Sequence, residues 1–461
     1  MRSEPFLTND AVVFGLLLLI LAVIFYTSNS GSKAWDKFYT YIPMLLLCYF
    51  IPSLFTSLGI IAPKWYESEN VINFLIEQGY PLPHDASWKE AVNLIKKEDI
   101  PKKVFDPFMH ESQLYFVASR YLLPACLVLL TMSISLKEIL KLGPKALIMF
   151  FTGTVGVVIG GPLALLIASM ISPDTVGGVG PEAVWRGMTT IAGSWIGGGA
   201  NQAAMYEIFK PTDKLYSIMI TVDVIVAEIW MAFLLFGVGK KDQLDKYFKA
   251  DSSAIDHLQQ KMHDFTKKIA RIPMTTDLFV VLAIGFGITG ISHLLADFIA
   301  PWIKNHAPGL GKLSLDSSFF WLIVLATTGG VIVSFTKLKK FEGAGASKIG
   351  SVFIFILVAT IGMKMNVLEI LDNPGLFVVG ALWMLVHVAL LFIVGKLIRA
   401  PYFFLAVGSK ANIGGAASAP VVAAAFHPSL APVGVLLAVL GYALGTYGAW
   451  VCGLLMQAAS P

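Results

Sequence analysis

Apolar runs long enough to cross a lipid bilayer fill most of this 461-residue chain. A membrane-spanning helix needs about 20 consecutive apolar residues. Only 14% of the residues are charged, against about 25% in a soluble domain. The sequence therefore predicts an all-α polytopic membrane protein with about 11–12 transmembrane helices. The candidate spans are 9–28, 39–61, 114–136, 145–171, 186–208, 213–239, 276–300, 318–336, 348–371, 374–397, 400–426 and 430–457.

One glycine-rich segment occurs twice. Residues 196–211 begin Ile-Gly-Gly-Gly-Ala-Asn, and residues 413–428, 217 positions later, begin Ile-Gly-Gly-Ala-Ala-Ser. Six of the sixteen aligned positions are identical, among them Phe209 with Phe426. Adjacent glycines are poor helix formers, and paired glycine-broken membrane segments point to the binding site of a transporter. We therefore expect two broken crossover helices, at about 186–208 and 400–426.

A second duplication predicts two repeats. Residues 132–140 match residues 363–371 at an offset of 231, so equivalent helices follow one another in the same order in both halves. The stretch 240–275 lies between the halves and holds eight Lys or Arg and five acidic residues. We expect an N-terminal half at 1–239, a polar linker at 240–275 and a C-terminal half at 276–461.

The basic loops predict the orientation of the halves. Loops 137–145, 337–348 and 396–399 favour the cytoplasm, which would give the two halves opposite topology. An inverted repeat needs an odd number of crossings between equivalent helices, so one of the twelve candidates must not span. We expect this to be 276–300, which three glycines interrupt, and place the C-terminus inside after eleven crossings.

A polar stretch at 62–113 interrupts the apolar pattern. Ser68 precedes an acidic helix-like run that Gly79 closes, and Ser87 with Glu90 forms the pattern of a capping box. We expect one or two short surface helices there.

The candidate binding residues surround the two glycine breaks. An interrupted membrane helix frees backbone carbonyl and N–H groups, which suit a coupling cation and an anionic substrate group. Small residues that only pack helices closely, with Ser and Asn as interhelical hydrogen bonders, are the structural alternative. The breaks and the oxygen donors beside them are Gly197, Gly198, Gly414 and Gly415, with Ser194, Asn201, Gln202, Ser409, Asn412 and Ser418.

Two carboxylates lie inside the candidate span 213–239. Asp223 and Glu228 are predicted to bind a coupling proton or cation, because intramembrane carboxylates are costly unless paired or solvated. For Glu228, contact with a lateral partner explains its position in an apolar span equally well. The second half has Leu440 and Gly445 at the equivalent positions.

Further polar residues lie in apolar runs. Arg120 and Lys364 are expected near helix ends, with their charges at the interface, and Glu207 is a further acid inside a run. Lys410 is expected to neutralise an anionic substrate or to replace a cation. We expect His387 to form an interhelical hydrogen bond.

Other classes of function have little support. Residues 285–290 match a dinucleotide-binding pattern, but no strand precedes them and they lie in a membrane run. The three cysteines lie in apolar segments without metal-ligand spacing, and the net charge of +4 is spread over loops. We expect no enzyme, no metal, no nucleic-acid partner and no cofactor other than Na⁺ or H⁺ as the coupling ion.

The order of these motifs resembles a known superfamily. A helix ending at 132–137, a plain helix and then a Gly-Gly-broken helix resemble the bile-acid:sodium symporters and their relatives with the sodium/proton-antiporter fold. Residues 406–414 look like the second broken helix of these proteins, and 197–202 like the first. The glycine-containing stretch 343–351, combined with the two broken helices, is most similar to the bacterial YjcL-like membrane proteins.

This resemblance implies a fold and a mechanism. It implies a panel (scaffold) domain, a core (transport) domain with two crossed broken helices, and an elevator-type movement of the core. It also implies a homodimer in lipid, in a bacterial inner membrane. The symporters carry an acidic sodium ligand where this chain has Ala406, and the antiporters carry acids where it has Asn201 and Gln202.

Three functions remain open from the sequence. The first is a secondary active transporter of a small organic solute, such as an organic anion, an amino acid or a small peptide, coupled to Na⁺ or H⁺. The second is a cation/proton antiporter with Asp223 as the carrier. The third is a membrane sensor or structural subunit without transport.

Overall fold

The computed structural model describes residues 3–42, 44–83, 85–132, 139–140, 142–250, 255, 272–313, 315–364, 374–427 and 430–461. The described residues are mostly helical and divide into two compact units. Unit 1 comprises residues 1–119 and 355–368, and unit 2 comprises residues 120–354 and 369–461. Most of the second duplication, 132–140 with 363–371, and most of the linker 240–275 lie outside the described residues.

Unit 1 contains three N-terminal helices and a small polar subdomain. The helices are α1 (Asp10–Ser28), α2 (Lys33–Tyr41) and α3 (Met44–Ser57). The side chain of Asp10 accepts hydrogen bonds from the Ser112 hydroxyl and the Gln113 N–H, at 2.6 and 2.9 Å. The Phe6 N–H donates to the Gly59 carbonyl. The beginning of α1, the end of α3 and the beginning of α6 (Leu114–Val117) therefore meet at one end of this unit.

The polar subdomain confirms the prediction of one or two short surface helices, and two are present. They are α4 (Ser68–Glu77) and α5 (Trp88–Lys97), and both halves of the capping box between Ser87 and Glu90 are formed. The short strands β1 (Lys64–Tyr66) and β2 (Met109–Glu111) pair antiparallel, and the 3-10 helix η1 (Lys102–Phe108) precedes β2. Val71, Leu75, Ala91, Ile95 and Phe105 form its apolar core.

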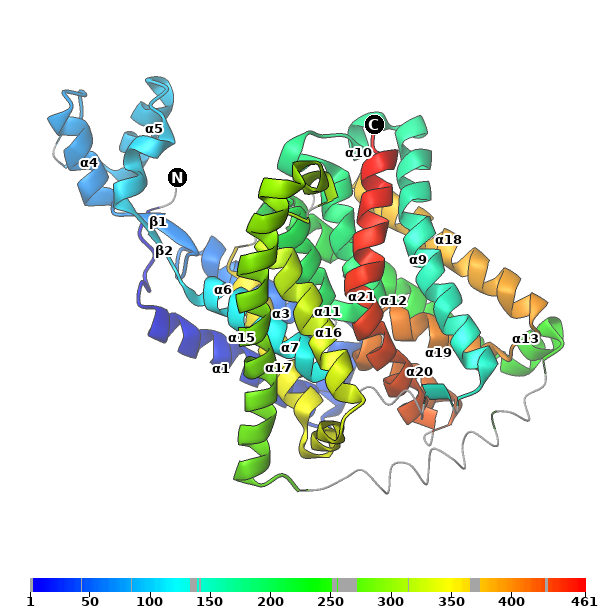
Figure 1. Ribbon diagram of the computed structural model, residues 1–461. Coiled ribbons are helices and arrows are strands. Elements are labelled where there is room, and N and C mark those ends of the chain that lie inside the picture. Colours follow the sequence, from blue (N-terminus) through cyan, green and yellow to red (C-terminus); the bar gives the residue numbers. More distant parts are fainter. Residues whose placement is uncertain are drawn as a thin grey trace. The chain divides into compact units, whose positions relative to one another are not determined.

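Unit 2 holds most of the long helices, shown in Figure 1. After the π-helical turn η2 (Ala118–Leu122), the chain forms α7 (Leu123–Met132), α9 (Pro144–Ile171), α10 (Pro173–Val176), η3 (Gly180–Glu182), α11 (Val184–Phe209), α12 (Asp213–Val238) and α13 (Lys241–Phe248). It continues with α15 (Thr275–His306), η4 (Pro308–Leu313), α16 (Ser318–Ser334), η5 (Lys337–Ala344), α17 (Ala346–Gly362), which passes into unit 1, α18 (Gly375–Leu397), α19 (Tyr402–Asn412), α20 (Gly415–Phe426) and α21 (Ala431–Ala459).

Within the described residues, seven helices are long and apolar enough to cross a membrane, or eight if the bent pair α16 and η5 counts as one span. The chain is therefore a multi-pass membrane protein by length and composition. One of the seven is α15, so the segment 276–300, which is predicted not to span, is long and apolar enough to do so. Its three glycines do not break the helix, because membrane helices tolerate glycine where each backbone group keeps its partner within the helix.

The first glycine-broken segment is a helical hairpin, not a crossing helix. A straight helix from residue 185 to residue 209 would be about 36 Å long. Instead, the rings of Trp185 and Phe209 lie 5.8 Å apart, and the Arg186 side chain donates to the Phe209 carbonyl at 2.6 Å. The chain reverses at Gly198, where φ is 71° and ψ is −173°. We call α11 hairpin 1, and it corrects the predicted crossover helix at 186–208.

The second segment folds back in the same way. Phe426, the last residue of α20, packs its ring 6.0 Å from Tyr402 and 5.2 Å from Phe403, which begin α19. The reversal occurs at Gly414 and Gly415, with φ of 106° and 56°. We call α19 and α20 together hairpin 2. It corrects the crossover helix predicted at 400–426, although the predicted positions of both glycine breaks are confirmed.

The two hairpins enter unit 2 from opposite ends. A Cβ atom added to Gly453, near the end of α21, would lie 2.5 Å from the Phe209 ring at the base of hairpin 1. The base of hairpin 2 lies at the other end, where the Tyr402 N–H bonds Asp245 of α13 at 2.7 Å and α21 begins shortly after Phe426. Figure 1 shows α20 and α13 at the end of unit 2 opposite the C-terminus.

Basic residues gather at the base of hairpin 2. Lys145, at the beginning of α9, donates to the Arg399 carbonyl at 2.9 Å, and Lys396 donates to the Tyr247 carbonyl. The C-terminal end of α21 is far from them, since Met456 packs beside Gly161 in the distal part of α9. The prediction that the C-terminus shares a membrane side with the basic loop 396–399 is therefore wrong.

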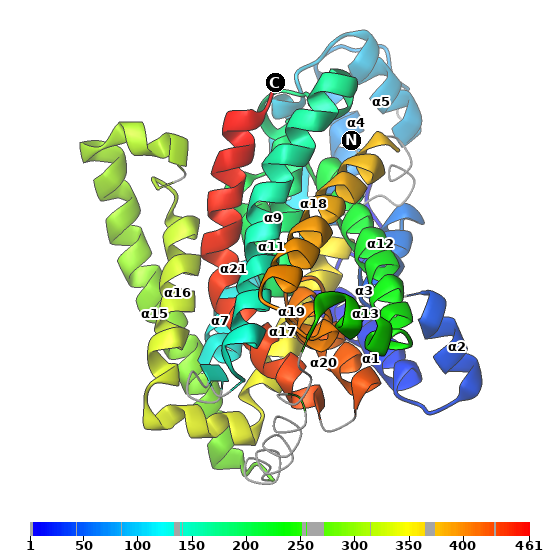
Figure 2. The same ribbon diagram turned by 90° about the vertical axis from the view of Figure 1, so that its right-hand side faces the viewer.

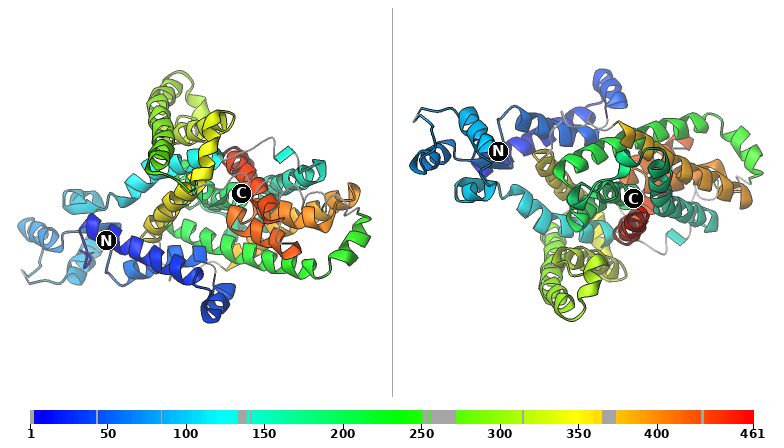
Figure 3. Two further views of the ribbon diagram at one scale, coloured as in Figure 1. Left: turned by 90° about the horizontal axis from the view of Figure 1, so that it is seen from below. Right: turned by 90° about the horizontal axis from the view of Figure 1, so that it is seen from above.

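The helices of unit 2 form two groups around α21. In Figure 2, α21 lies between α15 with α16 on one side and α9 with α18 on the other. The end-on views of Figure 3 show α15 and α16 together at one edge of this unit. Helix α7 packs against both of them. We call α7, α15 and α16 the outer group, and the hairpins with α9, α12, α18 and α21 the hairpin group.

Candidate functional site

The tips of the two hairpins meet at Tyr442, in the middle of α21. A Cβ atom added to Gly198 would lie 3.3 Å from the Tyr442 ring, and one added to Gly415 would lie 4.0 Å from the same ring atom. Tyr442 and Ser418 are half-buried, and Gly414 is exposed. The two reversals that the repeat predicts therefore meet at one point of the helical core.

Small residues on α21 receive the tip of hairpin 1. A Cβ atom on Gly445 would lie 2.5 Å from the Cα atom of Gly197, closer than packed atoms approach. A Cβ atom on Gly441 would lie 2.6 Å from the Ile196 carbonyl oxygen. The absence of side chains at these two positions lets the backbones touch. Gly197 is thus held by packing, and the reversal itself belongs to Gly198.

The Asn201 side chain is hydrogen-bonded to hairpin 1 and to α21. Its amide donates to the Gly197 carbonyl at 2.9 Å and to the Tyr442 carbonyl at 3.3 Å, and its carbonyl oxygen accepts from the Thr446 hydroxyl at 2.6 Å. The side chain is fully buried. It satisfies the carbonyl that the break frees on Gly197 and ties the hairpin tip to α21.

Asn412 has the corresponding role beside the tip of hairpin 2. Its amide donates to the Phe150 and Gly408 carbonyls, both at 3.0 Å, and its oxygen accepts from the Thr154 hydroxyl at 2.7 Å. It is also fully buried. Both asparagines thus stabilise the hairpins as interhelical hydrogen bonders.

Asp223 collects three donors from hairpin 1. Its carboxylate accepts from the Trp195 indole at 2.6 Å and from the Gln202 amide at 2.9 Å, and it is also hydrogen-bonded to Ser194. Its exposed fraction is 4%. The structure therefore brings three predicted site residues, Ser194, Gln202 and Asp223, into one buried cluster.

Lys410 places a buried cation beside this cluster. Its exposed fraction is 0%, and its ammonium group donates to the Ala227 carbonyl of α12 at 2.9 Å. Asp223 and Glu228, both on α12, interact with it electrostatically. A Cβ atom added to Gly414 would lie 3.1 Å from Lys410 Cε, so the side chain passes beside the tip of hairpin 2 before its ammonium group reaches α12.

Ser409 lies in a hydrogen-bonded chain that joins four helices, α12, α19, α18 and α9. The Trp230 indole donates to the Ser409 hydroxyl at 2.8 Å, which lies 2.8 Å from His387 Nε2, and His387 Nδ1 lies 3.0 Å from the Gly153 carbonyl. A carbonyl only accepts, so Nδ1 carries the proton and Nε2 accepts from Ser409. The predicted interhelical hydrogen bond of His387 is confirmed.

Two predicted residues remain accessible. Glu228 is exposed on α12, beside the exposed apolar residues Ile225 and Ile229, which fits the lateral alternative better than a place between the hairpins. Ser418 is half-buried, and a Cβ atom on Gly414 would lie 2.7 Å from its hydroxyl. Ser418 therefore lies directly at the tip of hairpin 2, next to the reversal.

Sequence reasoning missed several partners of the site. Tyr442, Trp195, Trp230 and Thr446 are uncharged and lie outside the duplicated segment or at its edge, so no motif marks them. Arg120 lies in the η2 turn near the beginning of the span Leu114–Met132, and its partly exposed guanidinium pairs with Glu207, a partner that the sequence did not indicate. Lys364 follows the end of α17 and lies 4.2 Å from the centre of the Tyr115 ring.

Comparison with known proteins identifies the family. The family described as "Protein of unknown function (DUF819)" matches residues 103–459, which covers both hairpins and the outer group. The chain belongs to this family. It is also 24% identical over 353 residues to a Bacillus subtilis (strain 168) protein named "Uncharacterized membrane protein YjcL", with 73% of this chain and 82% of that protein covered. Among the described residues, no three His, Cys, Asp or Glu side chains gather into a metal site.

Proposed function

We propose that this membrane protein is a secondary active transporter of a small organic solute, coupled to Na⁺ or H⁺. The observation that carries the proposal is the meeting of two re-entrant hairpins at Tyr442 from opposite ends of unit 2. Non-helical backbone at membrane depth is tolerated where protein or a water-filled cavity receives it. In hairpin 1 the Asn201 amide donates to the freed Gly197 carbonyl, whereas Gly414 at the tip of hairpin 2 is exposed.

The chemistry of the tips favours a solute with an anionic group. The returning helices begin at Gly199 and Gly415, so their N–H groups and positive dipole ends point to the same region. Ser418 adds a hydroxyl group there, and Lys410 adds a buried positive charge beside Gly414, with its ammonium group donating to the Ala227 carbonyl. An organic anion, an amino acid or a small peptide carries the carboxylate that such a site recognises.

The fold supports the inverted repeat that the sequence predicts. If hairpin 1 does not cross, the spans from α7 to α17 run α7, α9, α12, α15, α16 and α17, and the first and last of these have opposite directions. Each repeat would then read span, span, hairpin, span. The missing crossing would then belong to hairpin 1 and not to α15.

The basic residues support an orientation. Lys145, Lys396 and Arg399 favour a cytoplasmic position for the base of hairpin 2, because inside loops carry an excess of Lys and Arg. Hairpin 1 and the C-terminus then face the other side. Each hairpin would close the solute site toward its own side of the membrane, as alternating access requires.

The two helix groups support an elevator-type movement. The outer group would serve as the scaffold and the hairpin group as the transport domain that moves along it in the lipid. Among the described residues, hydroxyl groups meet between the two groups, with Thr327 3.3 Å from Thr446 and Thr328 2.6 Å from Tyr447. A homodimer would hold two scaffolds together while each hairpin group moves.

Cation/proton antiport is the second candidate. The buried charges of Asp223 and Lys410, on α12 and hairpin 2, are the observation in its favour. Against it, the Asp223 carboxylate already accepts three hydrogen bonds, which a carrier would have to give up in every cycle. Dissipation of a pH gradient in proteoliposomes by added cations, without organic solute, would favour this candidate.

A thermal-shift screen tests the site. Organic anions, amino acids and dipeptides are added to the purified protein, and a solute that binds the folded state raises the melting temperature. We expect Ser418→Ala to reduce this shift and Ser169→Ala, a change in α9 away from the tips, to preserve it. A solute whose shift survives Ser418→Ala unchanged would remove Ser418 from the site.

A further inference from the structure

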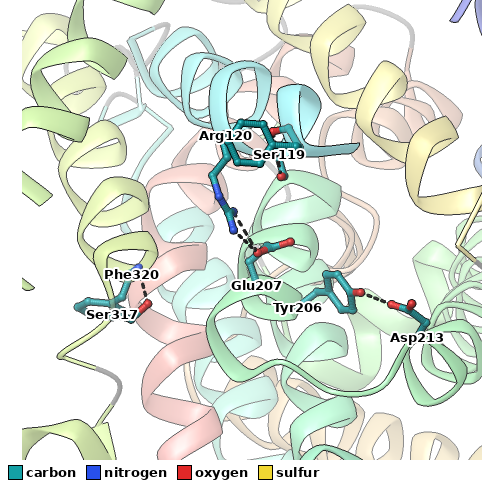
Figure 4. A network of polar contacts seen from close by, with 8 residues as sticks. Ser119, Arg120, Tyr206, Glu207, Asp213, Ser317 and Phe320 are labelled. Carbon is teal, nitrogen blue, oxygen red and sulfur yellow. Dashed lines mark hydrogen bonds and ion pairs between the residues drawn. The ribbon is translucent and has the colours of Figure 1, made fainter. Parts of the chain in front are cut away.

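An ion pair joins η2, the turn that leads into α7 of the outer group, to hairpin 1. Both terminal nitrogens of Arg120 lie 3.0 Å from one Glu207 oxygen (Figure 4). Glu207 is 9% exposed and lies on the returning half of hairpin 1, close to its base. Charged groups within membrane helices are costly unless paired, so this pair has a strong preference to stay formed.

The outer group holds Arg120 in place. Its guanidinium lies 4.3 Å from the centre of the Phe319 ring on α16, and its backbone carbonyl lies 2.8 Å from His293 Nε2 on α15. Arg120 itself belongs to the π-helical turn η2, where the chain departs from regular helix. Such turns often mark functional positions. The ring and backbone contacts fix Arg120 to the outer group.

Hairpin 2 has no corresponding pair. By the alignment of the repeats, Ala424 stands where hairpin 1 has Glu207, and Ser351 stands where η2 has Arg120. The polar side chains of hairpin 2 instead bond α9, α12 and α18, through Asn412, Lys410 and Ser409. Only hairpin 1 therefore carries a charged link to the outer group within the described part of the repeats.

We propose that the Arg120–Glu207 pair is a lock that holds the hairpin group in its present position against the outer group. The inference rests on the proposed transport cycle, in which the hairpin group moves along the outer group. Glu207 would move with hairpin 1 while Arg120 stays with Phe319 and His293. The pair must then separate in each cycle, and its strength sets how often the hairpin group leaves this position.

A cysteine between the two groups reports on the lock. Thr327 of α16 is fully buried and faces Thr446 of α21, and cysteine is close to threonine in size. The experiment uses full-length protein in proteoliposomes, with Thr327→Cys as the single cysteine after Cys48, Cys126 and Cys452 are replaced by alanine. The rate of modification by a small methanethiosulfonate reagent measures how often the groups separate.

Weakening the lock should speed this modification. We expect Glu207→Gln to raise the rate about tenfold, on the scale of a typical coupling between two conformational elements. Arg120→Lys, which keeps the charge but loses the two-nitrogen geometry, should raise it less. Asp213→Asn is the matched control, because Asp213 lies close in sequence and bonds Tyr206 within the hairpin group. The charge reversal Arg120→Glu with Glu207→Arg should bring the rate back toward the original.

The outcomes separate the lock from transport. A rate in Glu207→Gln no higher than in Asp213→Asn, or no recovery in the charge reversal, would overturn the lock. If Glu207→Gln does not fold, the same comparison is made with Arg120→Lys. No solute is needed for this readout, so a rate increase with a negative solute screen would retain the lock while rejecting the proposed transport.

Discussion

At the scale of residues, most polar groups of the predicted site act as interhelical links. Asn201 and Asn412 were predicted as donors for a solute or an ion, but each is buried with its hydrogen bonds made to protein. The sequence indicates that a polar residue lies in an apolar run. It does not indicate whether a neighbouring helix supplies the partner, because those partners, such as Thr446 and Phe150, are distant in sequence.

The Ser409 hydroxyl provides a test of these links. Ser409→Ala would leave the Trp230 N–H and His387 Nε2 without their shared partner, and an unsatisfied buried group costs about 1–3 kcal/mol. We expect a clearly lower free energy of unfolding in mixed micelles. Ser169→Ala, which removes a bond within one turn of α9, should change it by less than about 0.5 kcal/mol. Equal effects of the two substitutions would contradict the hydrogen-bonded chain.

The capping box of α5 predicts a pH effect outside the membrane segments. The hydrogen bond from the Ser87 backbone, then that from its hydroxyl, lower the pKa of Glu90. The ionised form therefore stabilises the helix above the ordinary glutamate pKa of about 4.3, and this stability is lost as the pH falls through the lower folded pKa.

Hydrogen exchange of α5 measures this effect. The protection of α5 is compared between the original protein and Glu90→Gln at each pH, which cancels the intrinsic pH dependence of exchange. We expect the original protein to be better protected at neutral pH and the difference to vanish in acid. A difference that persists at low pH would exclude the role of the carboxylate.

At the scale of elements, the apolar runs predicted the helices well and their paths less well. Hairpin 1 has 26 residues, enough to cross a bilayer, so its length could not distinguish a crossing helix from one that returns. The contacts that decide it, between Trp185 and Phe209 and between Tyr402 and Phe426, are tertiary. The glycine doublets indicate the position at which each hairpin turns, but not the angle of the turn.

The contact between hairpin 1 and α21 can be tested with one methyl group. Gly445→Ala would place its Cβ atom 2.5 Å from the Gly197 Cα atom, and overpacking of this kind costs about 1–3 kcal/mol. We expect a lower melting temperature. Gly287→Ala is the matched control, because its Cβ atom would have no neighbour within 4 Å in α15. Equal melting temperatures of the two variants would contradict the close approach of Gly445 to Gly197.

At the scale of the whole molecule, the hairpins decide the predicted topology. The basic loops and the need for an odd number of crossings between equivalent helices are both visible in the sequence. The glycines in 276–300 point to that segment as the one that does not span. With hairpin 1 as that segment, the basic linker and the other basic loops agree on one side.

Labelling from one side of the membrane tests this topology. Single cysteines are placed at Ser460, at the end of the chain, and at Lys249, which is exposed after α13. We expect an impermeant thiol reagent to label Ser460→Cys in intact cells and Lys249→Cys only after permeabilisation. Labelling of both positions from the same side would contradict the opposite entry of the two hairpins.

Solute uptake into proteoliposomes is the most direct test of the central claim. Labelled organic anions, amino acids and dipeptides are offered under an inward Na⁺ gradient, an inward H⁺ gradient or neither. We expect at least one solute to accumulate only under a gradient, and we expect Ser418→Ala to weaken its uptake while Ser169→Ala does not. Folded protein that accumulates no solute under either gradient would contradict the proposed transport.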